Sequence, residues 1–172
     1  ETSGVKLSYP ALTAFCRRAG IGDKPAGPAG QYHFEPGEEM QHDTSPHEVV
    51  LGGKKRPVQT ASAVLCYSRM LFFQCSARFQ RFDCKVFLTE ALKYFGGGCA
   101  TVMIDNTHVV VLKGTGADMV PVPEMEAFAE RYGFVFRAHA VGDANRSARV
   151  ERPFHYIENN FYAGREFTDL AD

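Results

Sequence analysis

The sequence predicts an α/β domain with a mixed five-stranded sheet: three antiparallel strands, further parallel strands, and helices on both faces. Three stretches rich in strand-forming residues follow one another between residues 39 and 76 without a helix between them, which is typical of an antiparallel meander. Two later strands, at 99–106 and 134–141, each follow a helical stretch, and this alternation builds parallel strands through crossover helices. With 172 residues and 45% hydrophobic residues, the chain can bury one core.

The N-terminal part differs in composition from the rest. Apolar residues recur at helical spacing from Leu12 to Ala19, Ser8 is a suitable N-cap and Gly20 a suitable end, so we predict a helix over residues 8–19. Residues 20–39 are dense in glycine and proline and show no hydrophobic period, as in interdomain linkers. We therefore expect a separate region at 1–20, a linker at 21–38 and the main domain at 39–172.

Within the main domain the predicted order is β-β-β-α-β-α-β-α. The first helix is expected over 78–97, with Phe82, Val86, Leu88, Leu92 and Phe95 largely on its buried face, and a glycine run ends it. The segment 52–57 reads as a hairpin turn, and 114–119 as a loop near the site. The strands are expected at 39–45, 56–70, 70–76, 99–106 and 134–141, the later helices at 124–133 and 142–160, and a further extended stretch at 107–112.

Charge, cysteine content and hydropathy exclude several classes of protein. The formal net charge is -1, so contact with nucleic acid would have to come from local patches. The five cysteines form no C-x-x-C pair, which indicates reduced thiols and no zinc or disulfide framework. No apolar run is long enough for a membrane span, and the N-terminus lacks the pattern of a signal peptide. We expect a soluble cytoplasmic protein.

Three acidic residues stand where a metal site could form. Asp43 lies in or at the end of the first strand, Asp105 directly follows an apolar strand, and Glu151 lies on the final predicted helix. Carboxylates from separate elements supply the oxygen ligands and the negative charge that a pair of hard divalent cations requires. If the first and fourth strands are neighbours, Asp43 and Asp105 would lie side by side, and the helix could bring Glu151 to them.

Three segments carry a resemblance to a known family. The stretches "EEMQHDTSPH", "VMIDNTHVVVL" and "GDANRSARVERPFHYIENNF" resemble the three catalytic blocks of DDE transposases with the retroviral-integrase-type core, and are closest to the IstA type of insertion-sequence transposase. The resemblance covers about residues 37–165. It implies an RNase H-like fold and phosphoryl transfer on DNA, in which transposon ends are cleaved and the freed 3′ hydroxyl attacks target DNA.

The resemblance also implies cofactors and partners. Two Mg²⁺ ions, with Mn²⁺ as a substitute, would be bound by Asp43, shared between both, and by Asp105 and Glu151, with one ion each. The expected partners are DNA, further copies of the chain in the full-length protein, and a helper ATPase. The expected location is the cytoplasm of a bacterium, in association with the nucleoid. Residues 1–20 are similar to the end of a helix-turn-helix DNA-binding region.

Basic residues surround the third acid. Arg146, Arg149 and Arg152 bracket Glu151, and guanidinium groups suit phosphate oxygens, so we assign them to DNA binding. His155 lies one helical turn beyond Glu151, where related integrases often carry a DNA-contacting basic residue. Glu158, a further turn along, departs from this pattern, because an acid should repel a nearby phosphate.

Other interpretations remain open. Each of the three acids, taken alone, could be a surface or turn residue. His42 and His47 flank Asp43 but fit no zinc pattern, so we interpret them as polar residues at the strand edge. An RNase H-like nuclease that never joins strands, and an inactive DNA-binding or assembly module, are the rival functions. The other acids that could replace a predicted ligand are Asp83, Asp118, Asp143 and Asp169, of which Asp143 is nearest to Glu151.

Overall fold

The computed structural model describes residues 8–21, 33–105, 107–139 and 153–171. Contacts divide the chain into two compact units, Glu1–Tyr32 and His33–Asp172. The first unit contains helix α1 (Tyr9–Ala19), which Ser8 caps by accepting a hydrogen bond from the backbone N–H of Ala11, and which ends at Gly20 with a φ of 63°. The predicted helix is confirmed. Most of the predicted linker lies outside the described residues, and the predicted domain boundaries stay predictions.

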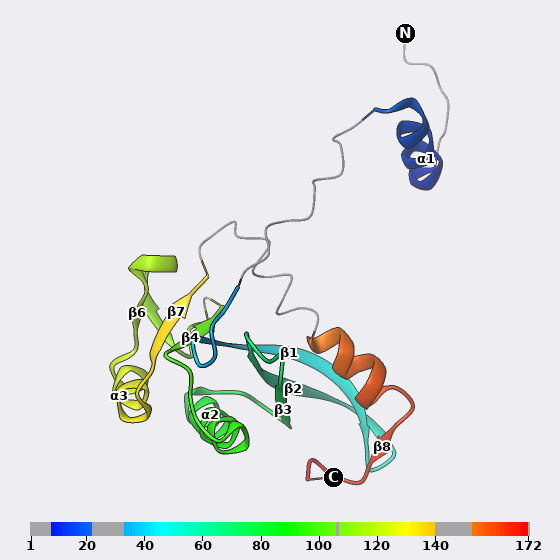
Figure 1. The fold of residues 1–172 in the computed structure, drawn as a ribbon. Helices are drawn as coiled ribbons and strands as arrows, with labels where there is room; N and C mark the ends of the chain where they lie inside the picture. The colour runs from blue at the N-terminus through cyan, green and yellow to red at the C-terminus, as the bar shows by residue number, and fades with distance from the viewer. Residues whose placement is uncertain (1–7, 22–32, 106, 140–152, 172) are drawn as a thin grey trace. The chain divides into compact units, whose positions relative to one another are not determined.

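The second unit is built on a mixed sheet (Figure 1). The first three strands form the expected antiparallel meander, β4 lies parallel to β1, and β7 lies parallel to β4, which confirms the predicted mixed sheet. A further short strand, β8, pairs with the distal end of β1 and was not predicted. The strands are β1 (Glu39–Leu51), β2 (Lys54–Leu65), β3 (Leu71–Ser76), β4 (Thr101–Ile104), β7 (Val135–Ala138) and β8 (Glu166–Phe167), and the main order is β3-β2-β1-β4-β7.

Strand β1 is longer than the sequence predicted. Its ladder with β2 continues without interruption from Met40 to Leu51, and the chain reverses at Gly52 and Gly53, whose φ angles are 56° and 72°. Glycine adopts these left-handed angles at little steric cost, so the hairpin turn predicted there is confirmed. Asp43 consequently lies inside a long strand.

The segment between β4 and α3 forms a small sheet of its own. Strand β5 (Val111–Lys113) pairs with β6 (Val120–Pro121), and the short 3-10 helix η1 (Gly116–Asp118) connects them. The backbone N–H of Val122 donates to the carbonyl of Val110. The extended stretch predicted at 107–112 therefore begins later, and it pairs outside the main sheet.

Helices cover both faces of the main sheet, as predicted. The large core lies under α2 (Arg81–Phe95) and α3 (Pro123–Tyr132), whereas Phe154 and Ile157 form a second cluster on the opposite face with Leu71 and Phe73 of β3. These two residues belong to the C-terminal helix, residues 153–162, which is α-helical to residue 157 and continues as the π-helix Glu158–Tyr162.

The predicted buried face of α2 is wrong in part. Phe82 is 70% exposed and Val86 is 45% exposed. The helix begins only at Arg81, and residues spaced three and four apart from Cys84 onward face the sheet, which turns Phe82 and Val86 outward. The buried residues of α2 are Cys84, Phe87, Leu88, Ala91 and Leu92.

Candidate active site at the ends of strands β1 and β4

Asp43 and Asp105 come together because β1 and β4 are parallel neighbours. The last pair in their ladder is His42 with Ile104, and each aspartate is the next residue along the chain. Adjacent strands lie about 5 Å apart, so the two residues occupy neighbouring positions on one side of the sheet. A small cavity of about 20 Å³ has both in its wall, together with His42, Thr44, Phe79, Thr107 and Val109. The adjacency of the first and fourth strands, the condition for bringing these two aspartates together, is met.

The alternation of side chains along β1 shows which face Asp43 occupies. The ring of His42 packs against Phe87 of α2, while the ring of His47 packs against Phe154 of the C-terminal helix. Asp43 lies four residues before His47 in an uninterrupted ladder, and side chains at even spacing share a face. Asp43 is therefore on the face that the C-terminal helix covers.

Short-range hydrogen bonds order the backbone around both aspartates. The N–H of Thr44 donates to Oδ1 of Asp43 at 2.7 Å, and the N–H of Thr107 donates to the carbonyl oxygen of Asp105 at 2.7 Å. Farther along the same loop, Nε of Arg81 donates to the carbonyl of Val109 at 3.2 Å. The loop after Asp105 is thus tied to α2. Asp105 is exposed and Asp43 is half-buried, which leaves this edge accessible to a ligand.

His42 is a buried core residue, so its interpretation as a strand-edge polar residue is wrong. Its Nδ1 lies 2.9 Å from the carbonyl oxygen of Ser62, which can only accept, so Nδ1 carries the proton and Nε2 is an acceptor. The thiol of Cys84 lies 3.7 Å from Nε2. Burial, assisted by the charge of Asp83, raises the pKa of Cys84 to about 12, so the thiol stays protonated and donates to Nε2. Burial lowers the pKa of His42 to about 4.

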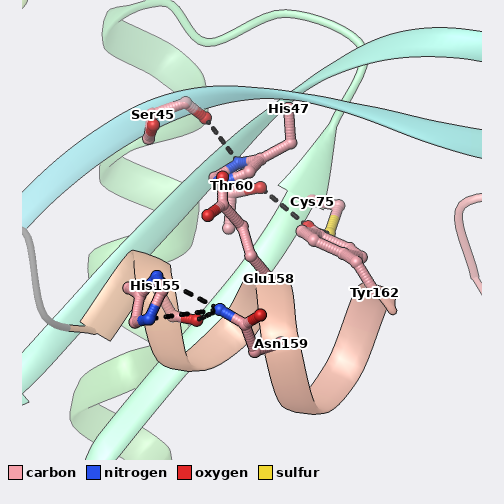
Figure 2. Close-up of polar contacts among 8 residues, drawn as sticks. All are labelled: Ser45, His47, Thr60, Cys75, His155, Glu158, Asn159 and Tyr162. Atoms are coloured by element: carbon pink, nitrogen blue, oxygen red, sulfur yellow. Dashed lines mark hydrogen bonds and ion pairs between the residues drawn. The ribbon is translucent and has the colours of Figure 1, made fainter. Parts of the chain in front are cut away.

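His47 is also buried, on the opposite face of the strand, and the strand-edge interpretation is wrong there too. Figure 2 shows its ring between the Ser45 backbone and the C-terminal helix. Nδ1 lies 3.1 Å from the carbonyl of Ser45, and Nε2 lies 3.3 Å from Oε1 of Glu158. The carboxylate of Glu158, which the sequence suggested would repel phosphate, therefore lies against a buried histidine ring of the sheet. Sequence reasoning missed this pair because its members are far apart along the chain.

A second polar contact fixes the end of the C-terminal helix. The hydroxyl of Tyr162 lies 2.7 Å from Oγ1 of the fully buried Thr60 and 2.6 Å from Sγ of Cys75. Burial, together with the hydrogen bond to Cys75, raises the pKa of the Tyr162 phenol. Figure 2 shows the three side chains meeting between the helix and the sheet. The phenol thus joins β2 and β3 to the helix.

Replacing Tyr162 by phenylalanine is expected to lower the free energy of unfolding by about 1 to 2 kcal/mol, because it leaves Thr60 without its partner. Urea denaturation followed by circular dichroism measures this. Tyr156 belongs to the same helix and is 60% exposed, so Tyr156→Phe is the matched control and should change stability by less than about 0.5 kcal/mol. Equal effects of the two substitutions would show that the buried contact contributes nothing.

The third predicted ligand and most predicted DNA contacts lie outside the described residues. Glu151, Arg146, Arg149 and Arg152 all fall in the segment 140–152, as does the alternative acid Asp143. His155 is exposed, and its ring nitrogens lie 3.1 and 3.4 Å from Nδ2 of Asn159. Among the residues that the structure does describe, no group of three His, Cys, Asp or Glu side chains could hold a metal ion.

Two of the alternative acids have local structural contacts. Oδ2 of Asp83 accepts a hydrogen bond from the N–H of Gln80 in the capping box of α2, and Oδ1 of Asp169 accepts from the N–H of Ala171. Asp118 lies in η1. All five cysteines are free, as predicted. No helix in the described ranges has the length and apolar character to cross a membrane.

Comparisons with known proteins relate the sequence to transposases. The chain is 29% identical over 139 residues to the transposase of insertion sequence IS640 from Shigella sonnei, a match that covers 81% of this chain and 44% of that protein. It is 28% identical over 139 residues to the transposase of IS21 from Pseudomonas aeruginosa, covering 81% and 36%. The chain thus spans less than half the length of these relatives. No family model matches the sequence.

Solved structures with a similar fold include integrases. The catalytic core domain of HTLV-2 integrase, solved in complex with magnesium, superimposes with a TM-score of 0.55 at 16% identity and covers 72% of this chain and 68% of that one. The intasome of simian T-cell lymphotropic virus contains a chain with a TM-score of 0.53 at 14% identity, covering 78% and 48%. The chain has the RNase H-like fold of integrase catalytic cores, and its sequence is related to insertion-sequence transposases.

Proposed function

We propose that this chain is the catalytic domain of a DDE-type transposase of the IstA type, which cleaves the DNA ends of an insertion sequence and joins them to target DNA. The observation that carries the proposal is the neighbouring positions of Asp43, inside β1, and Asp105, directly after β4, in an integrase-core fold. The sequence similarity to insertion-sequence transposases supports it independently.

The donor set fits hard divalent cations. Asp43 and Asp105 offer carboxylate oxygens at an accessible edge of the sheet, and oxygen is the ligand that Mg²⁺ and Mn²⁺ prefer. Glu151 precedes the C-terminal helix, which packs on the same face as Asp43, and we propose it as the third ligand. We assign Asp43 to both of two ions, and Asp105 and Glu151 to one each. Such ions, when bound, activate the attacking oxygen and stabilise the leaving oxygen.

The remaining assignments concern binding. Arg146, Arg149 and Arg152 would contact DNA phosphates, and the exposed His155 would extend this contact along the helix. Residues 1–20 would be the end of a helix-turn-helix region. Residues 21–38 would be a linker, and residues 39–172 would be the catalytic core. The HTLV-2 core was solved in a dimeric and a trimeric form, which supports self-association of the full-length protein. A helper ATPase and a nucleoid-associated location complete the proposal.

Two rivals make different predictions. An RNase H-like nuclease would cleave DNA without joining strands. An inactive binding or assembly module would need no acidic pair, and the accessible positions of Asp43 and Asp105 argue against it.

A strand-joining assay separates the proposal from both rivals. Transposon-end duplexes that already carry a free 3′ hydroxyl are incubated with the protein, Mn²⁺ and a labelled target DNA. We expect joined products, formed without a covalent protein intermediate, and none after the metal is chelated or in the Asp105→Asn variant, because that change removes a charged ligand. Cleavage without joining would favour the nuclease, and binding without either reaction would favour the inactive module.

A further inference from the structure

The contact between His47 and Glu158 links the strand of the candidate site to the helix that covers it. Nε2 of His47 and Oε1 of Glu158 lie 3.3 Å apart. This distance is within the range of an ion pair, but the angle at the contact is unfavourable for a hydrogen bond. The His47 side chain is 3% exposed and that of Glu158 is 52% exposed, so the pair lies at the rim of the helix–sheet interface.

The two ring nitrogens of His47 face different groups. Ser45 offers a carbonyl oxygen to Nδ1 and Glu158 offers a carboxylate to Nε2, and both groups only accept hydrogen bonds. A neutral imidazole has one N–H and can satisfy only one of them. Each ring nitrogen of His47 therefore faces an acceptor group. Among the residues that the structure describes, the other titratable group with a ring contact to His47 is Tyr162, whose hydroxyl is close to Thr60 and Cys75.

The His47–Glu158 pair lies on the same face of β1 as Asp43 of the candidate site. His47 follows Asp43 by four positions on the same face of β1, and Glu158 lies in the C-terminal helix, where Phe154 and Ile157 pack on that face. Hydrophobic contacts of this kind are non-directional and allow a helix to slide or rotate. A contact between one carboxylate oxygen and one ring nitrogen is localised, so at one rim of the interface it fixes both the position of the helix along the strand and its rotation.

We propose that His47 and Glu158 are positioning residues: their contact clamps the C-terminal helix at one register along β1, on the face of the strand that carries Asp43, and the metal site of the proposed function depends on that register. The clamp itself rests on the contacts described above. Its effect on metal binding rests on the proposed function. Neither residue contacts the reacting groups.

Two variants test the clamp while preserving shape. Glu158→Gln removes the charge, and His47→Phe keeps an aromatic ring against Phe154 and Tyr162 while removing both nitrogens. The matched control is Glu48→Gln, the same change in an exposed ion pair with Lys55 on β1. Hydrogen exchange of the amides at 153–162 reports docking of the helix, and titration with Mn²⁺ followed by electron paramagnetic resonance reports the metal site.

We expect hydrogen exchange in the helix to rise roughly fivefold in Glu158→Gln and in His47→Phe, with no further rise in the double variant. The affinity for Mn²⁺ should fall roughly tenfold in the same variants, while Glu158→Asp, which keeps the charge, should restore part of it. Glu48→Gln should change neither measurement.

The outcomes separate the clamp from the proposed function. If exchange in Glu158→Gln equals that in Glu48→Gln, or if the single effects add fully in the double variant, there is no clamp. If exchange rises while the affinity for Mn²⁺ is unchanged, the residues dock the helix but do not position a ligand. If the unaltered protein binds no Mn²⁺ yet its helix loses protection in both variants, the clamp stands and the proposed metal site fails.

Discussion

Replacing Asp43 by asparagine is expected to lower DNA cleavage and strand joining by roughly a thousandfold or more, which corresponds to about 4 kcal/mol of transition-state stabilisation. Asparagine has nearly the same volume as aspartate, but its neutral amide is a much weaker ligand for a divalent cation. Asp43 is half-buried inside β1, and the N–H of Thr44 donates to its carboxylate, a bond that the amide oxygen of asparagine can also accept. The fold should therefore survive the change.

The measurement compares initial rates of cleavage and joining on transposon-end DNA, with thermal unfolding as a check of the fold. Glu48→Gln removes a negative charge from the same strand at an exposed position and is the control, with expected rates close to those of the unaltered protein. If Asp43→Asn cleaves DNA at more than a tenth of the original rate, Asp43 is not a metal ligand, and the pairing of Asp43 with Asp105 in the proposed site is wrong.

The same assay examines Glu151, which lies outside the described residues. Glu151→Gln should lower both rates about as much as Asp43→Asn, and the double variant should be little worse than either, because residues that hold one metal cluster act as a unit. Retained activity in Glu151→Gln, with Asp43→Asn inactive, would mean that another acid completes the site. Asp143→Asn would then be the next variant, since Asp143 is the acid closest to Glu151 in the segment 140–152.

The parts of this fold that follow from local sequence patterns could be predicted. The helical spacing before Gly20, the glycine pair at the β1–β2 turn and the apolar strand before Asp105 each depend on residues close together in the chain. The order of elements then placed β1 beside β4 and the two aspartates together. Of the candidate site, only the neighbouring positions of Asp43 and Asp105 could be predicted in this way, because the topology of the sheet determines which strands lie side by side.

Features that depend on distant pairing were not predicted. The short strand β8 has too few residues to show an alternating pattern, and it exists because Val50 and Leu51 offer it a partner. The exposed positions of Phe82 and Val86 follow from where α2 begins and which face meets the sheet. His42 and His47 look alike in sequence on either side of Asp43, yet β1 directs them to opposite faces and gives them different partners.

His42 is expected to make the stability of the protein depend on pH. Its pKa is lowered from 6.5 to about 4 in the folded protein, because burial disfavours the charged ring more than the hydrogen bond to Ser62 favours it. In the unfolded chain the ring takes up a proton near pH 6.5, so between these values the unfolded state binds more protons than the folded one. Stability is therefore fully present above 6.5 and is lost as the pH falls toward 4, by about 3 kcal/mol over the whole interval.

Urea denaturation at a series of pH values across this interval measures the effect. Glutamine at position 42 does not titrate and carries an amide that can donate to the carbonyl of Ser62, so His42→Gln should be less stable at neutral pH but lose much less stability on acidification. His33 is exposed, and His33→Gln should follow the unaltered protein at every pH. If His42→Gln and the unaltered protein lose stability in parallel, the buried ring is not the origin of the dependence. If only His42→Gln escapes it, the buried ring beside Asp43 is the origin of the loss of stability in acid.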